Sequence, residues 1–295
     1  MNLEEIKQLA ASQQPKKAID RRFYHDEDIY RHEIDRIFLN SWMYAGHVSE
    51  IPNVGDWFLY EFATESVIIV RSDEDTVSGL VNVCRHRGSR VRAEDSGCSR
   101  RFTCPYHGWT YGLDGRLLVA AHMDEQFDKS SHGLKTVHCE LLAGMIFINF
   151  SADPAPFSIF TDELEDCLAP YDLANARVAH RQVYPIAANW KLSVENYSEC
   201  YHCAPSHPEY AQGHSLARPE RYSKDLMDAV NEKRPACGLS TKSFRQFGLE
   251  APAFGADISY EAYPLWNDHL TGSRDGKPVA PLLGSIREYD GGATD

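Results

Sequence analysis

The chain has 295 residues, of which 43% are hydrophobic, and a formal net charge of −13. This length can bury one large core or two moderate ones, and two domains is the better starting expectation. The acidic balance and the absence of a Lys/Arg cluster argue against a nucleic-acid surface, which needs concentrated positive charge.

Eight cysteines raise the question of redox compartment. The first 14 residues lack the pattern of a secretory signal, and the apolar runs fall short of the roughly 20 residues that cross a bilayer. We therefore expect a cytoplasmic protein with no membrane partner. In that reducing setting, grouped Cys and His residues indicate metal sites before disulfides.

In chain order, the first element expected is helical. Residues 1–42 are polar overall, but Ile34, Ile37, Phe38 and Trp42 recur at helical spacing and form one apolar face. Such a segment is expected to pack on a larger body.

Residues 57–150 instead carry short runs rich in β-branched and aromatic side chains, separated by turn residues. Asp114-Gly115 lies between two of these runs and is typical of a tight hairpin turn. This section predicts one small β domain.

A Pro-punctuated link at residues 151–156 ends the β-rich section. Beyond it the pattern predicts a helix over 159–171, a strand over 181–190, and a helix over 191–203 that stops near Pro205.

Two motifs within the β-rich section each offer one Cys and one His from a loop. They are Cys84-Arg85-His86-Arg87-Gly88 and Cys104-Pro105-Tyr106-His107-Gly108-Trp109. A Rieske [2Fe-2S] cluster needs this set, because two Cys hold one iron and two His hold the other. The same side chains could hold a structural zinc, but one intervening residue in the first motif departs from zinc-finger spacing. The sequence therefore favours the Rieske cluster.

A second group of candidate ligands occurs near Pro205. On a helix Glu195, Glu199 and His202 share one face, and His207 follows the proline. Two His and one carboxylate are the ligand set of mononuclear Fe(II) oxygenases. Paired histidines also occur where they only satisfy local hydrogen bonds, so spacing alone leaves both interpretations open.

With both groups in view, the chain resembles the Rieske non-haem iron oxygenases, in their alpha (oxygenase) subunit. The resemblance runs from residue 36 to the end of the chain and is strongest in the two metal motifs. It implies an α+β fold in which an antiparallel β Rieske domain is inserted in a helix-grip catalytic domain, a curved antiparallel sheet on a long helix. The expected domains are 1–42 (N-terminal helical part of the catalytic domain), 43–155 (Rieske) and 156–295 (catalytic).

The resemblance also implies roles for individual residues. Cys84, His86, Cys104 and His107 would hold the cluster. His202 and His207 would hold the mononuclear iron, and Glu199 would serve catalysis as a bridge toward the cluster histidine of a neighbouring subunit. The implied assembly is a head-to-tail homotrimer that receives electrons from a separate NAD(P)H-dependent reductase and uses O2.

Glu stands at 199 where many members of this family have Asp, which is similar to the branch acting on carnitine, glycine betaine and choline. The resemblance therefore implies hydroxylation or N-demethylation of a quaternary or tertiary amine. An aromatic acid or hydrocarbon is the alternative substrate class.

The family completes its iron site with an Asp from a later helix, which we cannot match to Asp268, Asp290 or Asp295. The chain is thus expected to be a member shortened at its C-terminus. A catalytically incomplete Rieske electron carrier is the alternative from another functional class.

Overall fold

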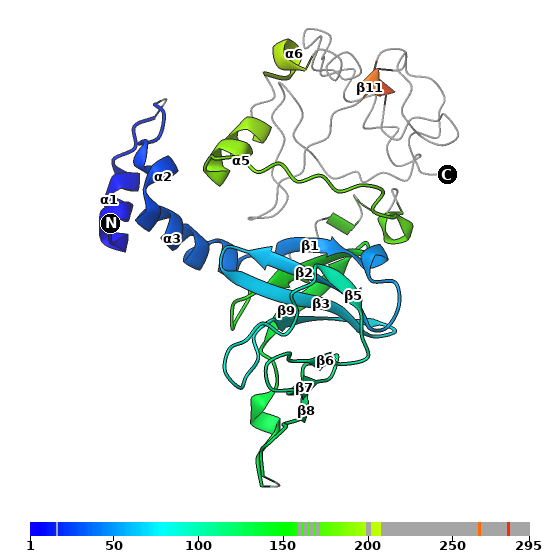
Figure 1. Cartoon of the computed structure of the whole chain (residues 1–295). Helices are drawn as coiled ribbons and strands as arrows, with labels where there is room; N and C mark the ends of the chain where they lie inside the picture. Colours follow the sequence, from blue (N-terminus) through cyan, green and yellow to red (C-terminus); the bar gives the residue numbers. More distant parts are fainter. Residues whose placement is uncertain are drawn as a thin grey trace. The chain divides into compact units, whose positions relative to one another are not determined.

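The computed structural model describes residues 1–15, 17–124, 126–158, 161, 164–165, 168, 172–198, 202–207, 265–266 and 282–283. The chain divides into two compact units (Figure 1). The first unit contains Met1–Pro156 and Ala174–Tyr184, and the second contains Phe157–Leu173 and Pro185–Asp295. Within the described part of the chain, no helix has the length and apolar character needed to cross a membrane.

The N-terminal segment is helical, as predicted, but in short pieces: α1 (Leu3–Ala11), α2 (Arg22–His25), α3 (Glu27–Arg36) and the 3-10 turn η1 (Phe38–Asn40). The side chain of Asp26 caps α3 by accepting hydrogen bonds from the first backbone amides of the helix. Because α3 ends at Arg36, Trp42 does not lie on a helix. Its indole donates instead to the carbonyl of Ala155 (2.8 Å), which joins the start and the end of the β-rich section.

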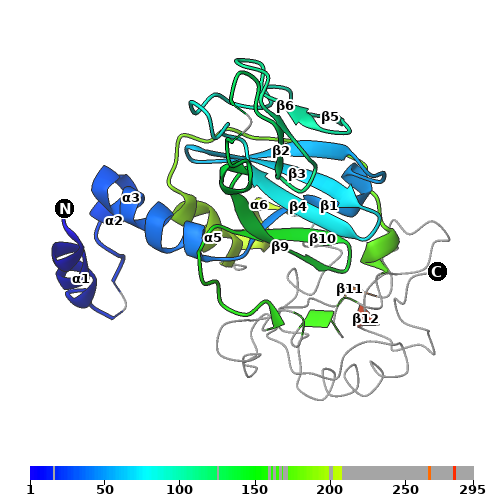
Figure 2. The same ribbon diagram turned by 90° about the horizontal axis from the view of Figure 1, so that it is seen from below.

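Seven strands form the large sheet of the first unit, in the order β1-β10-β9-β4-β3-β2-β5, and all neighbours are antiparallel (Figure 2). They are β1 (Met43–His47), β2 (Asp56–Phe62), β3 (Glu65–Asp73), β4 (Thr76–Val81), β5 (Ser96–Cys98), β9 (Thr136–Leu142) and β10 (Met145–Asn149). Two further 3-10 turns lie at η2 (Val48–Glu50) and η3 (Ser130–His132).

The unbroken apolar run in β3 is explained by burial on both faces of this sheet. Val67, Ile68, Ile69 and Val70 are all fully buried. Alternate side chains of a strand point to opposite faces, so Val67 and Ile69 pack in one core while Ile68 and Val70 pack in the other. The core that contains Ile68 and Val70 also contains Cys84, so it connects the sheet to the Cys/His motifs.

A separate three-stranded antiparallel sheet carries the second Cys/His motif. Its strands are β6 (Phe102–Thr103), β7 (Thr110–Tyr111) and β8 (Leu117–Val119). The hairpin between β7 and β8 confirms the predicted turn: Gly115 has φ +82°, and the Asp114 carboxylate accepts from the Arg116 amide at 3.0 Å.

Beyond residue 156, the named elements are η5 (Leu173–Asn175), α5 (Trp190–Ser198), α6 (Cys203–Ser206) and a parallel pair of two-residue strands, β11 (Leu265–Trp266) and β12 (Leu282–Leu283). The strand predicted for 181–190 is wrong. Residues 181–189 form no strand, and α5 begins at Trp190. Within the first unit, Arg181 forms an ion pair with Glu50 (2.7 Å) and is not part of a strand ladder.

The helix predicted for 191–203 is described as α5 up to Ser198, and residues 199–201 fall outside the described part of the chain. Pro205 lies within the first turn of α6, where a missing amide hydrogen costs nothing. The α+β class is confirmed. The curved sheet of the helix-grip domain, and most of the helix predicted over 159–171, fall outside the described residues.

Candidate metal sites

The two Cys/His loops share one backbone design. In the first, the Cys84 amide donates to the Ser89 carbonyl (2.8 Å) and the Gly88 amide donates to the Cys84 carbonyl (3.0 Å). The second loop repeats both bonds. The Cys104 amide donates to the carbonyl five residues later (2.8 Å), and the amide four residues after Cys104 donates to the Cys104 carbonyl (3.1 Å). Each cysteine therefore uses both its backbone amide and its backbone carbonyl to hold a turn of six residues.

Both turns depend on a glycine in the left-handed region. Gly88 has φ +75° and Gly108 has φ +71°. A Cβ at Gly88 would meet no atom within 4 Å. The backbone angle, and not crowding within the protein, therefore requires glycine there.

The fold brings like ligands together. Cys84 and Cys104 are 3% and 2% exposed, and their thiols are in hydrogen-bonding contact. The rings of His86 and His107 lie 4.6 Å apart between centroids, at 74°. Across the described ranges, no three His, Cys, Asp or Glu side chains gather around one point as a single-ion site. The four residues thus form a thiol pair and an imidazole pair.

The surroundings alter the acidity of these groups. Burial raises the pKa of the Cys84 thiol, while hydrogen bonds from the Tyr111 hydroxyl and the His86 backbone amide act in the opposite direction. Desolvation, followed by the nearby His86 and Arg87, lowers the pKa of His107. A neutral imidazole is the form that binds metal, so the second effect favours ligation.

One ring nitrogen supports the fit of a metal group directly. The Nδ1 atom of His86 is buried and has no hydrogen-bond partner among the residues that the structure describes. A buried polar atom without a partner is costly, and iron at this atom would satisfy it. Two imidazoles side by side, with two thiols close to each other in one core, suit a [2Fe-2S] cluster held by sulfur and nitrogen.

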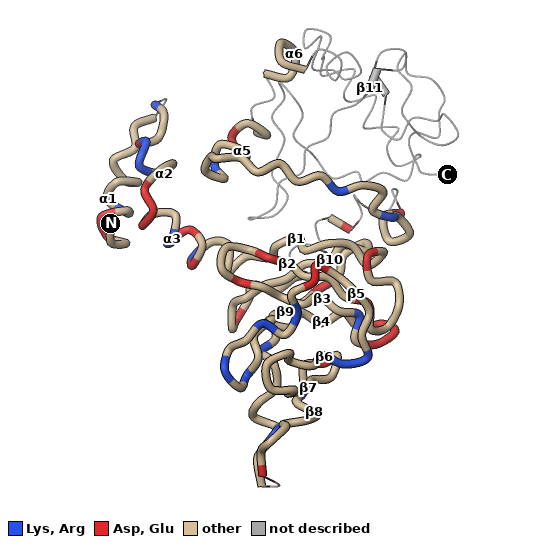
Figure 3. The backbone as a smooth tube through the Cα atoms, viewed as in Figure 1, with Lys and Arg blue, Asp and Glu red and all other residues tan. Residues whose placement is uncertain are grey.

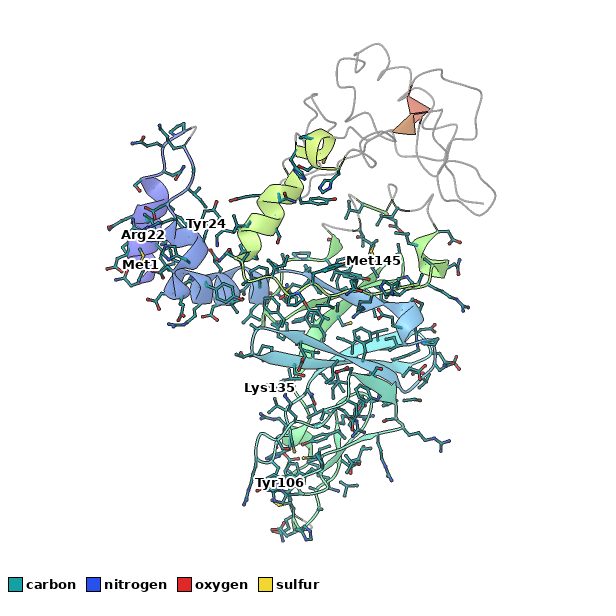
Figure 4. The ribbon with its side chains drawn as sticks, turned by 45° about the horizontal axis from the view of Figure 1, so that its top comes forward. Met1, Arg22, Tyr24, Tyr106, Lys135 and Met145 are labelled. Carbon is teal, nitrogen blue, oxygen red and sulfur yellow. The ribbon has the colours of Figure 1, made fainter. Side chains whose placement is uncertain are left out.

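The protein surface beside these loops is positively charged in places. Arg100 and Arg101 lie on the connection between β5 and β6, which is blue in Figure 3. Tyr106, between the second loop's Cys and His, is 61% exposed and lies at the small-sheet end of the first unit in Figure 4.

The second predicted site is described in part. The rings of His202 and His207 lie 5.4 Å apart at 75°, on either side of α6. The His207 amide donates to the Cys203 carbonyl at 2.9 Å, which fixes the chain just after this short helix. Glu199, the predicted bridging carboxylate, lies outside the described residues. The histidine pair is compatible with two ligands to one ion.

Two protein-family models match the parts of the chain that carry the two groups of candidate ligands. Residues 41–138 match the Rieske [2Fe-2S] domain family, and residues 173–251 match the family described as ring hydroxylating alpha subunit (catalytic domain). The chain is 34% identical over 266 residues to the carnitine monooxygenase oxygenase subunit of Escherichia coli K12, covering 87% of this chain and 67% of that protein.

The chain belongs to the Rieske non-haem iron oxygenase family. This Rieske oxygenase is also 40% identical over 278 residues to the glycine betaine monooxygenase oxygenase subunit of Pseudomonas aeruginosa, a match covering 94% of this chain. It spans 64% of the length of that relative.

A similar solved structure is that of the quaternary ammonium Rieske monooxygenase CntA in complex with L-carnitine. The TM-score is 0.59 at 34% sequence identity, and the match covers 65% of this chain and 55% of that one. Naphthalene 1,2-dioxygenase from Rhodococcus sp. gives a TM-score of 0.61 at 27% identity, covering 71% and 50%. The predicted family and its cofactors, a Rieske cluster and a mononuclear iron, are confirmed.

The roles of the individual ligands remain predictions. Sequence reasoning also missed Tyr111, whose hydroxyl reaches Cys84. Its only sequence signal is its position two residues after Trp109 in the strand that follows the second motif.

Proposed function

We propose that this chain is the terminal oxygenase component of a monooxygenase that hydroxylates or N-demethylates a quaternary or tertiary amine. The observation that supports it most is the pairing of thiol with thiol and imidazole with imidazole in a chain 40% identical to a glycine betaine monooxygenase subunit. The reaction would consume O2 and electrons delivered by a separate NAD(P)H-dependent reductase.

In this proposal Cys84 and Cys104 hold one iron of the cluster, and His86 and His107 hold the other. The cluster supplies one-electron storage, at a potential raised by its neutral imidazole ligands. The buried, unpartnered Nδ1 of His86 favours ligation, and the lowered pKa of His107 favours a neutral ring that can bind metal. The two glycine turns hold the four side chains at the ends of short, hydrogen-bonded loops.

His202 and His207 would hold the mononuclear iron, with a third protein ligand not assigned. Glu199 would connect this site to a cluster histidine of a neighbouring subunit in a head-to-tail homotrimer. Residues 1–42 and 156–295 would form the catalytic domain around a Rieske domain at 43–155. We place the protein in the cytoplasm because the grouped cysteines suit a reducing compartment, and the described ones are free thiols.

The names of the more similar relatives favour an amine substrate over an aromatic one. Those at 33–40% identity are named for glycine betaine or carnitine, whereas the alpha subunit of benzene 1,2-dioxygenase from Pseudomonas putida is 32% identical over 192 residues. A cation of this kind needs an aromatic cage for binding. The aromatic residues that would build one lie largely beyond the described residues.

The cofactor assignment is tested by spectroscopy on the purified full-length chain. We expect acid-labile sulfide, a visible spectrum bleached by dithionite, and an EPR signal with the low average g-value of a His-ligated cluster. Cys104→Ser should abolish that signal, whereas Cys98→Ser, which changes an exposed cysteine between the motifs, should retain it. A zinc-containing, colourless preparation would refute the assignment.

The substrate class is tested by substrate-dependent O2 uptake with a reductase. Glycine betaine, carnitine and choline are compared with benzoate and with naphthalene, and release of formaldehyde is measured as the product of N-demethylation. Turnover of aromatic compounds alone would support the aromatic alternative. A reducible cluster with no uptake on any compound would support the electron carrier.

A further inference from the structure

Asn82 lies two residues before Cys84 and closes the base of the first ligand loop. Its side chain is fully buried, and its carbonyl oxygen accepts hydrogen bonds from the backbone amides of Val91 (3.0 Å) and Arg92 (2.8 Å). Its amide nitrogen donates to the Arg92 carbonyl (2.8 Å) and to the Ser66 hydroxyl in β3 (3.1 Å). The side chain therefore ties both ends of the loop to each other and to the large sheet.

Arg92 continues this connection to the second ligand loop. Its guanidinium lies over the rings of Trp57 in β2 (5.7 Å from the ring centroid) and Phe102 in β6 (5.2 Å). The same group donates to the carbonyls of Arg101 (3.4 Å) and Thr103 (3.5 Å), and Thr103 directly precedes the second loop. One arginine thus contacts a strand of each sheet.

We propose that Asn82 and Arg92 act together as positioning residues, which hold the two ligand loops at the separation that a cluster requires. The first loop lies between β4 and β5 of the large sheet, and the second lies between β6 and β7 of the small sheet. The strand ladders described for the two sheets therefore do not join the loops. This inference rests on the assignment of Cys84 and Cys104 as cluster ligands in the proposed function.

The separation of the loops matters because both cysteines are predicted to bind the same iron. Metal–ligand distances in proteins vary by only about 0.2 Å around their preferred values, so a small shift of one loop moves a sulfur out of position. Groups that support the ligands from behind hold this geometry before the metal binds and after it has bound.

The side chains at these two positions are of the types that such a connection needs. A primary amide offers two acceptor sites and two donor hydrogens, and Asn82 uses all four. A guanidinium combines a planar face for aromatic rings with a fork of donors for carbonyls, whereas lysine has a compact charge with neither. An apolar side chain of the same size would fill either space but would make none of these hydrogen bonds.

The arginine is tested by the stability of the bound cluster in the full-length chain. We expect Arg92→Lys to lose its visible absorption to an iron chelator about tenfold faster than the unaltered chain, because loss of supporting groups lowers metal affinity by this order. Its EPR signal should also broaden, since the two loops would then adopt more than one separation. General destabilisation of the fold does not by itself broaden the signal of an intact cluster.

Arg71→Lys is the matched control. The Arg71 guanidinium, in the same unit, donates to the backbone carbonyls of Ile51 (2.6 Å) and Glu74 (3.0 Å), neither of which lies in a ligand loop. This variant should keep the cluster lifetime and the EPR line width of the unaltered chain. Urea unfolding of both metal-free variants compares their stabilities.

The asparagine is tested by Asn82→Asp, which keeps the acceptors and removes both donors. We expect cluster loss to be faster by about tenfold again. Asn149→Asp is its control, because Asn149 is equally buried and its side chain bonds the Asn40 carbonyl (3.3 Å) and the Ser151 amide (2.8 Å), away from the ligand loops. It should retain the cluster.

A variant carrying both changes tests whether the two residues act as one unit. It should lose its cluster about as fast as either single variant, whereas independent action would give about a hundredfold. A hundredfold acceleration would overturn the inference, as would equal cluster lifetimes and EPR line widths in Arg92→Lys and Arg71→Lys. The arginine comparison decides the matter even if Asn82→Asp does not fold. Absence of a cluster from the unaltered chain would instead refute the proposed function.

Discussion

The imidazole ring of His86 stacks on the indole of Trp109, with centroids 4.8 Å apart and 11° between the planes. Trp109 is 2% exposed and also meets Phe127 and His132 edge-on. The indole therefore sets the plane of a predicted iron ligand while belonging to the core.

This contact predicts different outcomes for two substitutions of Trp109. Trp109→Ala should lower the free energy of unfolding by about 3–5 kcal/mol, because it leaves a large cavity, and should reduce cluster content. Trp109→Phe should cost much less, since it keeps an aromatic face and removes an indole Nε1 that has no partner in the described part of the chain. Urea unfolding of the metal-free chain measures the free energy of unfolding, and iron and sulfide analysis measures the cluster content. Equal loss of cluster in both variants would contradict a role for stacking.

The left-handed conformation of Gly88 predicts a graded response to side chains. Because a Cβ there would touch nothing, the cost should come from the backbone alone. We expect a loss of about 1–2 kcal/mol for Gly88→Ala, less for Gly88→Asn, and more for Gly88→Val, since asparagine tolerates this region and β-branched residues do not. Urea unfolding of the metal-free variants gives the order. Equal stability of the Asn and Val variants would exclude this explanation.

The adjacent rings of His202 and His207 predict selective loss of the mononuclear iron. Either histidine replaced by Ala should remove this iron and leave the cluster EPR signal and its sulfide unchanged. Iron-to-sulfide ratios measure the change. His180→Ala, at an exposed position in the first unit, is the control and should retain both metals. Unaltered iron in both variants would exclude the pair as ligands.

Two cysteines outside the motifs should differ in reactivity. Burial raises the pKa of Cys139 to about 12, so at pH 8 only about one thiol in ten thousand is the reactive thiolate. Cys98 is exposed, and hydrogen bonding to Asp56 raises its pKa. Iodoacetamide should therefore modify Cys98 first, at a rate that rises with pH as the thiolate fraction increases.

Removing the carboxylate charge tests the cause of this shift. Asp56→Asn should lower the pKa of Cys98 and speed its alkylation at pH 8, whereas Asp75→Asn, on an exposed turn, should leave the rate unchanged. Mass spectrometry of peptides at timed intervals measures both rates. A slower reaction in Asp56→Asn would show that the carboxylate acts by another route.

Strong local patterns accounted for much of the first unit. The apolar runs within residues 57–150 predicted short β segments, and Asp114-Gly115 predicted a hairpin turn. The structure confirms both, with β2, β3, β4 and β10 and with the turn at Gly115. β5 was missed because Ser96–Cys98 is short, exposed and contains glycine. β1 was missed because Met43–His47 becomes a strand by pairing with β10, about one hundred residues later.

The sequence by itself determined the candidate ligands, because residue type and spacing carry that information within a few positions, and the resemblance of its two metal motifs indicated the family. The tertiary structure decided which of those side chains meet. Cys84 and Tyr111 are 27 residues apart, and Trp42 and Ala155 are 113 apart. Contacts of this kind depend on how sheets and loops close on one another, and the pairing of sulfur with sulfur, nitrogen with nitrogen and phenol with thiol therefore emerges only in the folded chain.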